Sequence, residues 1–138
     1  EAPNIVAEKN LIACNKAFKH VKIEYKDYSQ IKPEENDFVY FDPPYHPTAG
    51  NFTGYTKFDF TEKDQLNLRD FILTLHKKNV KIMLSNSNTD YIREIYNNKI
   101  FTINTVKAPR FINCKPKERN HVVEAIITNY LTDERKAD

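Results

Sequence analysis

Two short apolar runs, with a segment of helical periodicity between them, constrain the fold of this chain most. "FVYF" (38–41) is continuously apolar, as in a central parallel strand covered on both faces, and "VKIML" (80–84), which is apolar except for Lys81, indicates another buried strand. Between the two runs, the apolar residues from Leu68 to Leu75 recur at helical spacing. Strands that alternate with a helix in this way indicate an α/β fold with parallel strands.

Local signals mark the elements of the first half. Residues 4–18 carry apolar side chains at helical spacing, and "VKIEY" (21–25) alternates apolar and polar residues as a strand does. Thr61 is an expected N-cap, and Asp64 three residues later completes a weak capping box. We expect the helix that begins there to end near "KKN" (77–79).

The second half continues the alternation. "SNSN" (85–88) is typical of a turn, and a short helix is expected to carry the apolar residues of 91–96. "IFTINTV" (100–106) and "HVVEAIITNY" (121–130) indicate two final strands joined by a basic loop. The chain as a whole predicts an α/β fold with a mostly parallel sheet that ends in an antiparallel hairpin.

Composition limits the classes of protein and of site. A chain of 138 residues suits one domain, and no apolar run approaches the length of a membrane helix. Cys14, Cys114 and the four histidines share no metal-ligand spacing, so we expect no metal and a reducing cytoplasm. Only two glycines are present, which excludes the usual glycine-rich nucleotide loop within this chain. The net charge of +2 permits a nucleic-acid partner without indicating one.

Three polar clusters follow predicted strands. They are Asp27–Tyr28, residues 42–45 ("DPPY") and residues 85–88. Ligands of open α/β sheets bind at the carboxyl ends of strands, so we expect these clusters to converge on one edge. Within the last cluster, Asn86 and Asn88 are expected to cap the next helix rather than to contact a substrate.

The order of these segments resembles that of a known enzyme family. "DPPY" directly after an apolar strand is similar to the catalytic motif of the Dam-type, D12-class adenine-specific DNA methyltransferases. The later segments, and the opening one from "PNI" to "KIEYKDYSQI", resemble the same family in the same order. The segments that carry the resemblance are "FVYFDPPY" (38–45), "GNFTGYTKFDFT" (50–61), "KIMLSNSN" (81–88), "APRFINCKPKERNHVVEAIITNY" (108–130) and residues 3–31.

The resemblance implies a three-layer, Rossmann-like fold of S-adenosylmethionine-dependent methyltransferases, here incomplete. Residues 1–138 would be the C-terminal catalytic part, because the family's glycine-containing cofactor motif and its target-recognition region are not found in them. In that fold the strand 21–25 is separated from 38–41 by two strands of the missing part. Open sheet edges at such a gap favour association, so a homo-oligomer is expected.

The resemblance also implies the roles of the site residues. Asp42, Pro43, Pro44 and Tyr45 would be catalytic, with Asp42 and the Pro43 carbonyl accepting hydrogen bonds from the adenine amine and Tyr45 stacking on the flipped base. Asp27 and Tyr28, together with Asp42, would bind S-adenosyl-L-methionine. A direct methyl transfer of this kind uses no metal. The purely structural alternative for residues 42–45 is a strand that ends in an Asp-Pro turn. For Asp27 and Tyr28 it is an ordinary strand end.

Contacts with double-stranded DNA are expected from two loops, although solvated polar loops are the simpler interpretation of both. The loop 46–60 is long for a compact domain, and the loop before the final strand is basic. The expected DNA-contacting residues are Asn51, Thr53, Tyr55, Arg110, Lys115, Lys117 and Arg119.

Two other functions remain open at this point. The chain can be a non-catalytic binding or dimerising module with an incomplete cofactor pocket. It can also belong to an enzyme that methylates cytosine or RNA bases through a similar motif.

Overall fold

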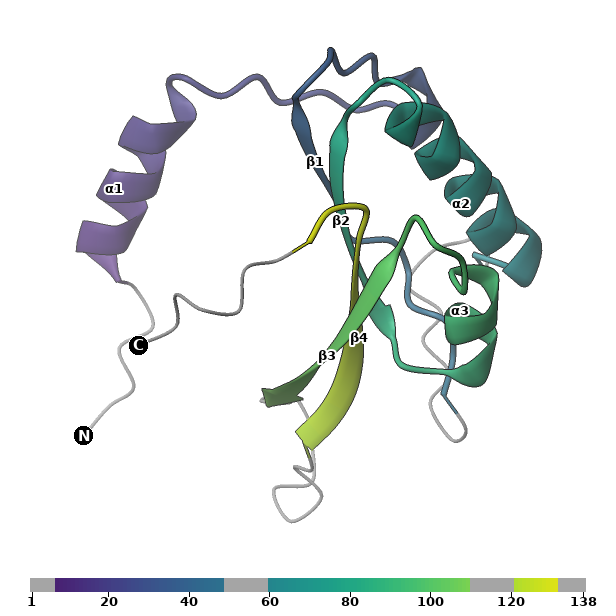
Figure 1. Ribbon diagram of the computed structural model, residues 1–138. Coiled ribbons are helices and arrows are strands. Elements are labelled where there is room, and N and C mark those ends of the chain that lie inside the picture. Colours follow the sequence, from purple (N-terminus) through teal and green to yellow (C-terminus); the bar gives the residue numbers. More distant parts are fainter. Residues whose placement is uncertain (1–6, 49–59, 110–120, 132–138) are drawn as a thin grey trace. The chain divides into compact units, whose positions relative to one another are not determined.

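The computed structural model describes residues 7–48, 60–109 and 121–131, and it divides the chain into two compact units, residues 1–31 and 32–138 (Figure 1). The expected DNA-contacting residues of both loops, which lie in 49–59 and 110–120, fall outside the described residues. The structure therefore describes the polar residues that follow the predicted strands, but not the two loops.

The first unit contains one helix and one short turn. Helix α1 spans Glu8–Phe18, which confirms the described part of the helix expected over 4–18, and a 3-10 turn spans Tyr28–Gln30. No residue of α1 is buried, and its apolar residues Leu11 and Phe18 are exposed.

The strand expected over 21–25 is wrong, because these residues adopt neither helix nor strand. Val21, Ile23 and Tyr25 are all exposed. A strand is completed only by hydrogen bonds to a neighbour, and none of the four described strands pairs with this segment. Residues 21–25 thus have the alternating sequence of a strand but no paired strand among the described residues.

The second unit is built on a four-stranded sheet with the order β1-β2-β4-β3. The β1 and β2 strands are parallel, whereas β4 pairs antiparallel with both β2 and β3. The α/β class, the parallel pair and the final hairpin are confirmed, but two of these three pairings are antiparallel, so the described sheet is not mostly parallel. The strands are β1 (Phe38–Phe41), β2 (Lys81–Ser87), β3 (Thr102–Pro109) and β4 (His121–Thr128).

Helix α2 (Glu62–His76) connects the parallel strands, and its start was predicted correctly. The Thr61 hydroxyl accepts a hydrogen bond from the Asp64 amide, and the Asp64 carboxylate accepts one from the Thr61 amide at 2.8 Å. Such a box satisfies two backbone donors at the helix start. The buried stripe of α2 includes Leu68 and Ile72, and Figure 1 shows α2 and α3 (Asp90–Ile95) on the same side of the sheet.

Strand β1 lies at an edge of the described sheet, which differs from the expected strand covered on both faces. Phe38 and Tyr40 are 56% and 52% exposed, whereas Phe41 is buried and its ring meets that of Phe71 of α2 edge-on. Successive side chains of a strand point to opposite faces. Helix α2 therefore covers the face of Phe41, and the face of Tyr40 stays open among the described residues.

Strand β2 extends further than expected, so the predicted turn at 85–88 is wrong. Ser85, Asn86 and Ser87 belong to β2 and pair with residues 124–126 of β4. Antiparallel pairing supplies backbone partners that outweigh the turn preference of serine and asparagine. The expected capping role of Asn86 and Asn88 is also wrong, because Thr89 caps α3 through a hydrogen bond from the Ile92 amide.

Candidate active site

Asp42, the first residue of the DPPY motif, follows β1 directly and is exposed. Its Oδ1 accepts a hydrogen bond of 2.9 Å from the hydroxyl of Ser85, a buried residue of β2. The Ser85 oxygen also lies 2.9 Å from the Tyr40 hydroxyl. Since the single Ser85 proton goes to the carboxylate, Tyr40 donates to Ser85. Asp42 Oδ2 has no hydrogen-bond partner among the described residues, so one carboxylate oxygen is held and the other is open.

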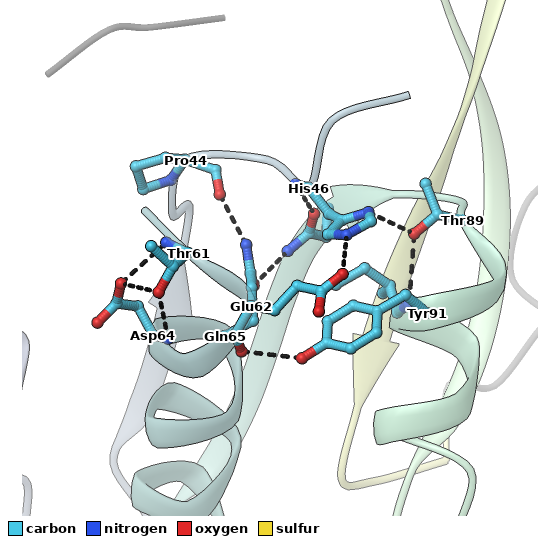
Figure 2. Close-up of polar contacts among 10 residues, drawn as sticks. Pro44, His46, Thr61, Glu62, Asp64, Gln65, Thr89 and Tyr91 are labelled. Atoms are coloured by element: carbon cyan, nitrogen blue, oxygen red, sulfur yellow. Dashed lines mark hydrogen bonds and ion pairs between the residues drawn. The ribbon is translucent and has the colours of Figure 1, made fainter. Parts of the chain in front are cut away.

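Two buried amide side chains hold the backbone on either side of Tyr45. Gln65 Nε2 donates to the Pro44 carbonyl at 2.9 Å, as Figure 2 shows, and the His46 amide donates to Asn86 Oδ1 at 2.9 Å. The two amides are linked, because Asn86 Nδ2 donates to Gln65 Oε1 at 3.1 Å. Both side chains are 0% exposed. Residues 44–46, which follow β1 in the chain, are therefore tied both to α2 and to β2.

Tyr45 itself is half-buried. Its hydroxyl donates to Glu124 Oε2 of β4 at 3.3 Å. Burial raises the pKa of Tyr45 to about 12, against the opposing effect of the Ser85 hydroxyl, and the negative charges of Glu124 and Asp42 add to the rise. The phenol is therefore neutral at ordinary pH, and its ring is held from the hydroxyl end as well as from the backbone.

His46 connects the motif to the start of two helices. Its Nδ1 lies 3.0 Å from the hydroxyl of Thr89, the N-cap of α3, and its Nε2 lies 3.5 Å from the Glu62 carboxylate of α2. The imidazole stacks on the Tyr91 ring with centroids 4.8 Å apart, and the Tyr91 hydroxyl donates to the Glu62 carbonyl at 2.8 Å (Figure 2). These contacts place His46 between α2 and α3.

The expected cofactor residues Asp27 and Tyr28 lie in the first unit. Asp27 Oδ1 accepts hydrogen bonds from the Ser29 hydroxyl at 2.6 Å and from the Ser29 amide at 2.9 Å, which begins the 3-10 turn. These two hydrogen bonds, the side-chain one first, lower the pKa of Asp27. Asp27 thus has a local structural role as the N-cap of this turn.

The structure brings together residues of two predicted clusters and adds others that the sequence patterns did not single out. Asp42–Tyr45 and 85–88 meet as expected, but through β2 itself and not through a turn. The additional residues are Gln65, Ser85 and Glu124. A signal was available for Gln65, which stands one helical turn before Leu68 on the apolar stripe of α2.

Two negative findings concern the described part of the chain. None of its helices has both the length and the apolar character needed to cross a membrane. In the same residues, no three histidine, cysteine, aspartate or glutamate side chains gather as a candidate metal site.

Comparison with known proteins identifies the family. A model of the D12 class of N6 adenine-specific DNA methyltransferases matches residues 1–112. The chain is 42% identical to the Type II methyltransferase M.MjaIII of Methanocaldococcus jannaschii over 134 residues, which is 93% of this chain and 46% of that protein. It is 40% identical to the Type II methyltransferase M1.LlaDCHI of Lactococcus lactis subsp. cremoris over 80% of this chain and 39% of that protein.

A third relative is the DNA adenine methylase of Escherichia coli (strain K12), with 30% identity over 71% of this chain and 35% of that protein. The chain thus spans less than half the length of these three relatives. The family match nevertheless covers most of its residues, and the chain belongs to the D12 class of N6 adenine-specific DNA methyltransferases.

Proposed function

We propose that this chain is the C-terminal catalytic part of an enzyme that transfers a methyl group from S-adenosyl-L-methionine to the exocyclic amine of adenine in double-stranded DNA. Membership of the D12 class supports the reaction and the base. The observation that carries the assignment to particular residues is the state of Asp42, whose Oδ1 is held by Ser85 while Oδ2 is open at the end of β1.

The chemistry of the amine explains why such a carboxylate is needed. The lone pair of the adenine amine is delocalised into the ring, which makes the nitrogen a poor nucleophile. Two hydrogen-bond acceptors placed at its two hydrogens favour tetrahedral nitrogen and free the lone pair for attack. We assign these acceptors to Asp42 Oδ2 and to the Pro43 carbonyl. Pro43 and Pro44 restrict φ to about −65°, so the carbonyl is oriented before the base arrives.

Tyr45 is assigned the binding of the flipped base by stacking. A base–aromatic stack contributes about 1–3 kcal/mol, which is comparable with the few kcal/mol that extruding a base costs. The Tyr45 ring is half-buried and held through its hydroxyl by Glu124, so little ordering of the side chain is left for the binding step.

S-adenosyl-L-methionine supplies the electrophilic methyl group when it is bound. Asp27, Tyr28 and Asp42 would hold it, and their chemistry fits, because carboxylates accept from its amino and hydroxyl groups and an aromatic ring suits its adenine. Asp27 keeps one oxygen, Oδ2, without a hydrogen bond to a described residue. A chain with two glycines supplies no glycine-rich loop, so we assign the rest of the cofactor site to residues beyond this sequence. The proposed transfer needs no metal ion.

The DNA contacts are assigned to the two loops. Asn51, Thr53 and Tyr55 would line the entrance for the DNA. The phosphate contacts are assigned to the basic loop, where they position the duplex without specifying its sequence. The basic residues are Arg110, Lys115, Lys117 and Arg119.

We also propose that the described sheet is part of the incomplete three-layer, Rossmann-like methyltransferase fold, with cytoplasmic action on DNA. The position of β1 supports this, because β1 is an edge strand among the described strands, and an unpaired edge is a site for further strands. In this chain alone, the same edge would favour a homo-oligomer.

The test uses the intact protein from which the chain comes. S-adenosyl-L-methionine binding is measured by calorimetry, and methyl transfer is measured to matched duplexes that offer either adenine or cytosine amines. We expect binding and transfer to adenine alone. Transfer to cytosine would correct the base assignment, and an intact protein that neither binds nor transfers would leave the non-catalytic binding module as the better description.

A further inference from the structure

The DPPY motif fixes its own backbone only in part. Proline restricts φ at residues 43 and 44, but ψ of Pro44 and both dihedral angles of Tyr45 remain free in the chain itself. These angles decide where the Tyr45 ring points, because they set the peptide planes before and after it. Some other part of the molecule therefore has to orient the residue that is proposed to bind the base.

The linked amides Gln65 and Asn86 contact these two planes. The Pro44 carbonyl belongs to the plane before Tyr45 and accepts from Gln65, whereas the His46 amide belongs to the plane after it and donates to Asn86. When both planes are held, φ and ψ of Tyr45 are held as well. One amide comes from α2 and the other from β2, and a direct hydrogen bond joins them.

The burial of these two amides is not explained by packing alone. Both are 0% exposed, and an unpaired amide in such a place is costly. Apolar side chains would fill the space between α2 and β2 with no such requirement. Each amide instead has a hydrogen bond to the motif and one to the other amide. Asn86 Oδ1 also accepts from the Ser87 amide at 2.8 Å, but one hydrogen bond of each side chain goes to a peptide that flanks Tyr45.

We propose that Gln65 and Asn86 are positioning residues for methyl transfer, which hold the Tyr45 ring in the orientation that receives the adenine. The inference rests on the proposed function for its consequence, and on the hydrogen bonds alone for its structural part. Neither side chain needs to contact DNA or S-adenosyl-L-methionine. Their effect reaches the substrate through the backbone of residues 44–46.

The experiment replaces each amide by an apolar side chain of similar size, Gln65→Met and Asn86→Leu, in the intact protein. In steady-state methylation of an adenine duplex we expect kcat to fall about ten-fold or more in each variant, as for the loss of a buried hydrogen bond. The KM for S-adenosyl-L-methionine should stay within about two-fold, because the amides are not assigned to the cofactor. The double variant should lose less than the product of the two single losses, since the amides act as one unit.

Two control variants separate positioning from general destabilisation. Asn67→Met removes an exposed amide from the same helix, one that has no hydrogen bond to a described residue. Leu68→Ala opens a cavity in the core one helical turn after Gln65 and removes no hydrogen bond. With the folded fraction measured by circular dichroism, we expect both controls to keep the wild-type kcat per folded molecule. Equal losses of kcat in Leu68→Ala and Gln65→Met would overturn the proposal.

Hydrogen exchange of the His46 amide provides a readout that needs no activity. We expect this amide to be protected in the wild type and to exchange at least about ten-fold faster in Asn86→Leu, with no such change in Asn67→Met. An unchanged exchange rate would overturn the proposal. If the wild-type protein does not methylate DNA, the proposed function fails, and the exchange rates still decide whether the amides hold the motif.

Discussion

The Ser85 hydroxyl donates a hydrogen bond of 2.9 Å to Asp42 Oδ1, just beyond the last parallel pair of β1 and β2. That pair is Phe41 and Leu84, so Asp42 and Ser85 each directly follow it. The parallel register thus places a buried donor beside an exposed carboxylate. In the proposed reaction, the Asp42 carboxylate would therefore be oriented before the adenine binds.

The first prediction concerns this hydrogen bond. Ser85→Ala should lower kcat of the intact enzyme by roughly 10- to 150-fold, because a hydrogen bond to a charged group contributes about 1.5–3 kcal/mol. Ser87→Ala is the matched control, since Ser87 lies in the same strand and its hydroxyl bonds to no described residue. Equal kcat values for the two variants would show that the Asp42 orientation does not depend on Ser85.

The second prediction concerns Asp42. Asp42→Ala should reduce methyl transfer on the order of 100-fold or more, because it removes one of the two acceptors for the amine. The folding of the variant is checked by circular dichroism. Asp70→Ala, which changes an exposed aspartate of α2, should retain transfer. Substantial transfer by Asp42→Ala would show that the carboxylate is not central to the reaction.

The third prediction separates the ring of Tyr45 from its hydroxyl. Tyr45→Ala should lower kcat/KM by roughly 5- to 150-fold, which corresponds to a stacking contribution of about 1–3 kcal/mol. Tyr45→Phe should lose much less, because the ring remains and only the 3.3 Å hydrogen bond to Glu124 is removed. Equal losses in both variants would assign the role to the hydroxyl.

The fourth prediction follows from the pKa of Tyr45. Its folded-state pKa of about 12 lies above the ordinary value of 10.0, so the unfolded state loses its proton first as pH rises. The contribution of Tyr45 to stability is therefore complete below pH 10 and is lost as pH rises toward 12. Urea unfolding of the wild type and of Tyr45→Phe at about pH 9 and about pH 11 checks this.

Between these two pH values, the free energy of unfolding should fall more for the wild type than for Tyr45→Phe. The comparison at equal pH cancels the titration of the lysines and of the other tyrosines. Parallel falls in the two proteins would mean that Tyr45 titrates at its ordinary pKa and is not buried as described.

The fifth prediction tests the basic loop. Lys117→Ala should weaken binding to all DNA sequences alike, and it should reduce the slope of log K against log salt by about 0.9, the value for one phosphate contact. Lys78→Ala, just after α2, should leave that slope unchanged. An unchanged slope for Lys117→Ala would show that Lys117 contacts no phosphate and would favour a solvated loop.

Features that depend on neighbours in the chain were predicted well from the sequence. The capping box of Thr61 and Asp64 joins residues three positions apart, and its geometry is the expected one. The α2 helix and the strand before the DPPY motif were also located correctly. In these cases the interactions that stabilise an element lie within the element or next to it.

The same local pattern failed at residues 21–25, where alternation predicted a strand and none is found. It failed again at 85–88, where turn-forming residues continue β2 because β4 pairs with them. A strand is a property of two segments, and the second segment is not visible in the pattern of the first.

The sequence by itself determined the motif, the helix that follows it and the chemistry of its residues. Only the tertiary structure decided that Ser85 holds Asp42, and that Gln65 and Asn86 hold the backbone around Tyr45. These partners are 43, 21 and 40 residues apart in the chain. The physical reason is that a hydrogen bond requires atoms to meet within about 3 Å, and over such separations only the order and register of the sheet bring them together.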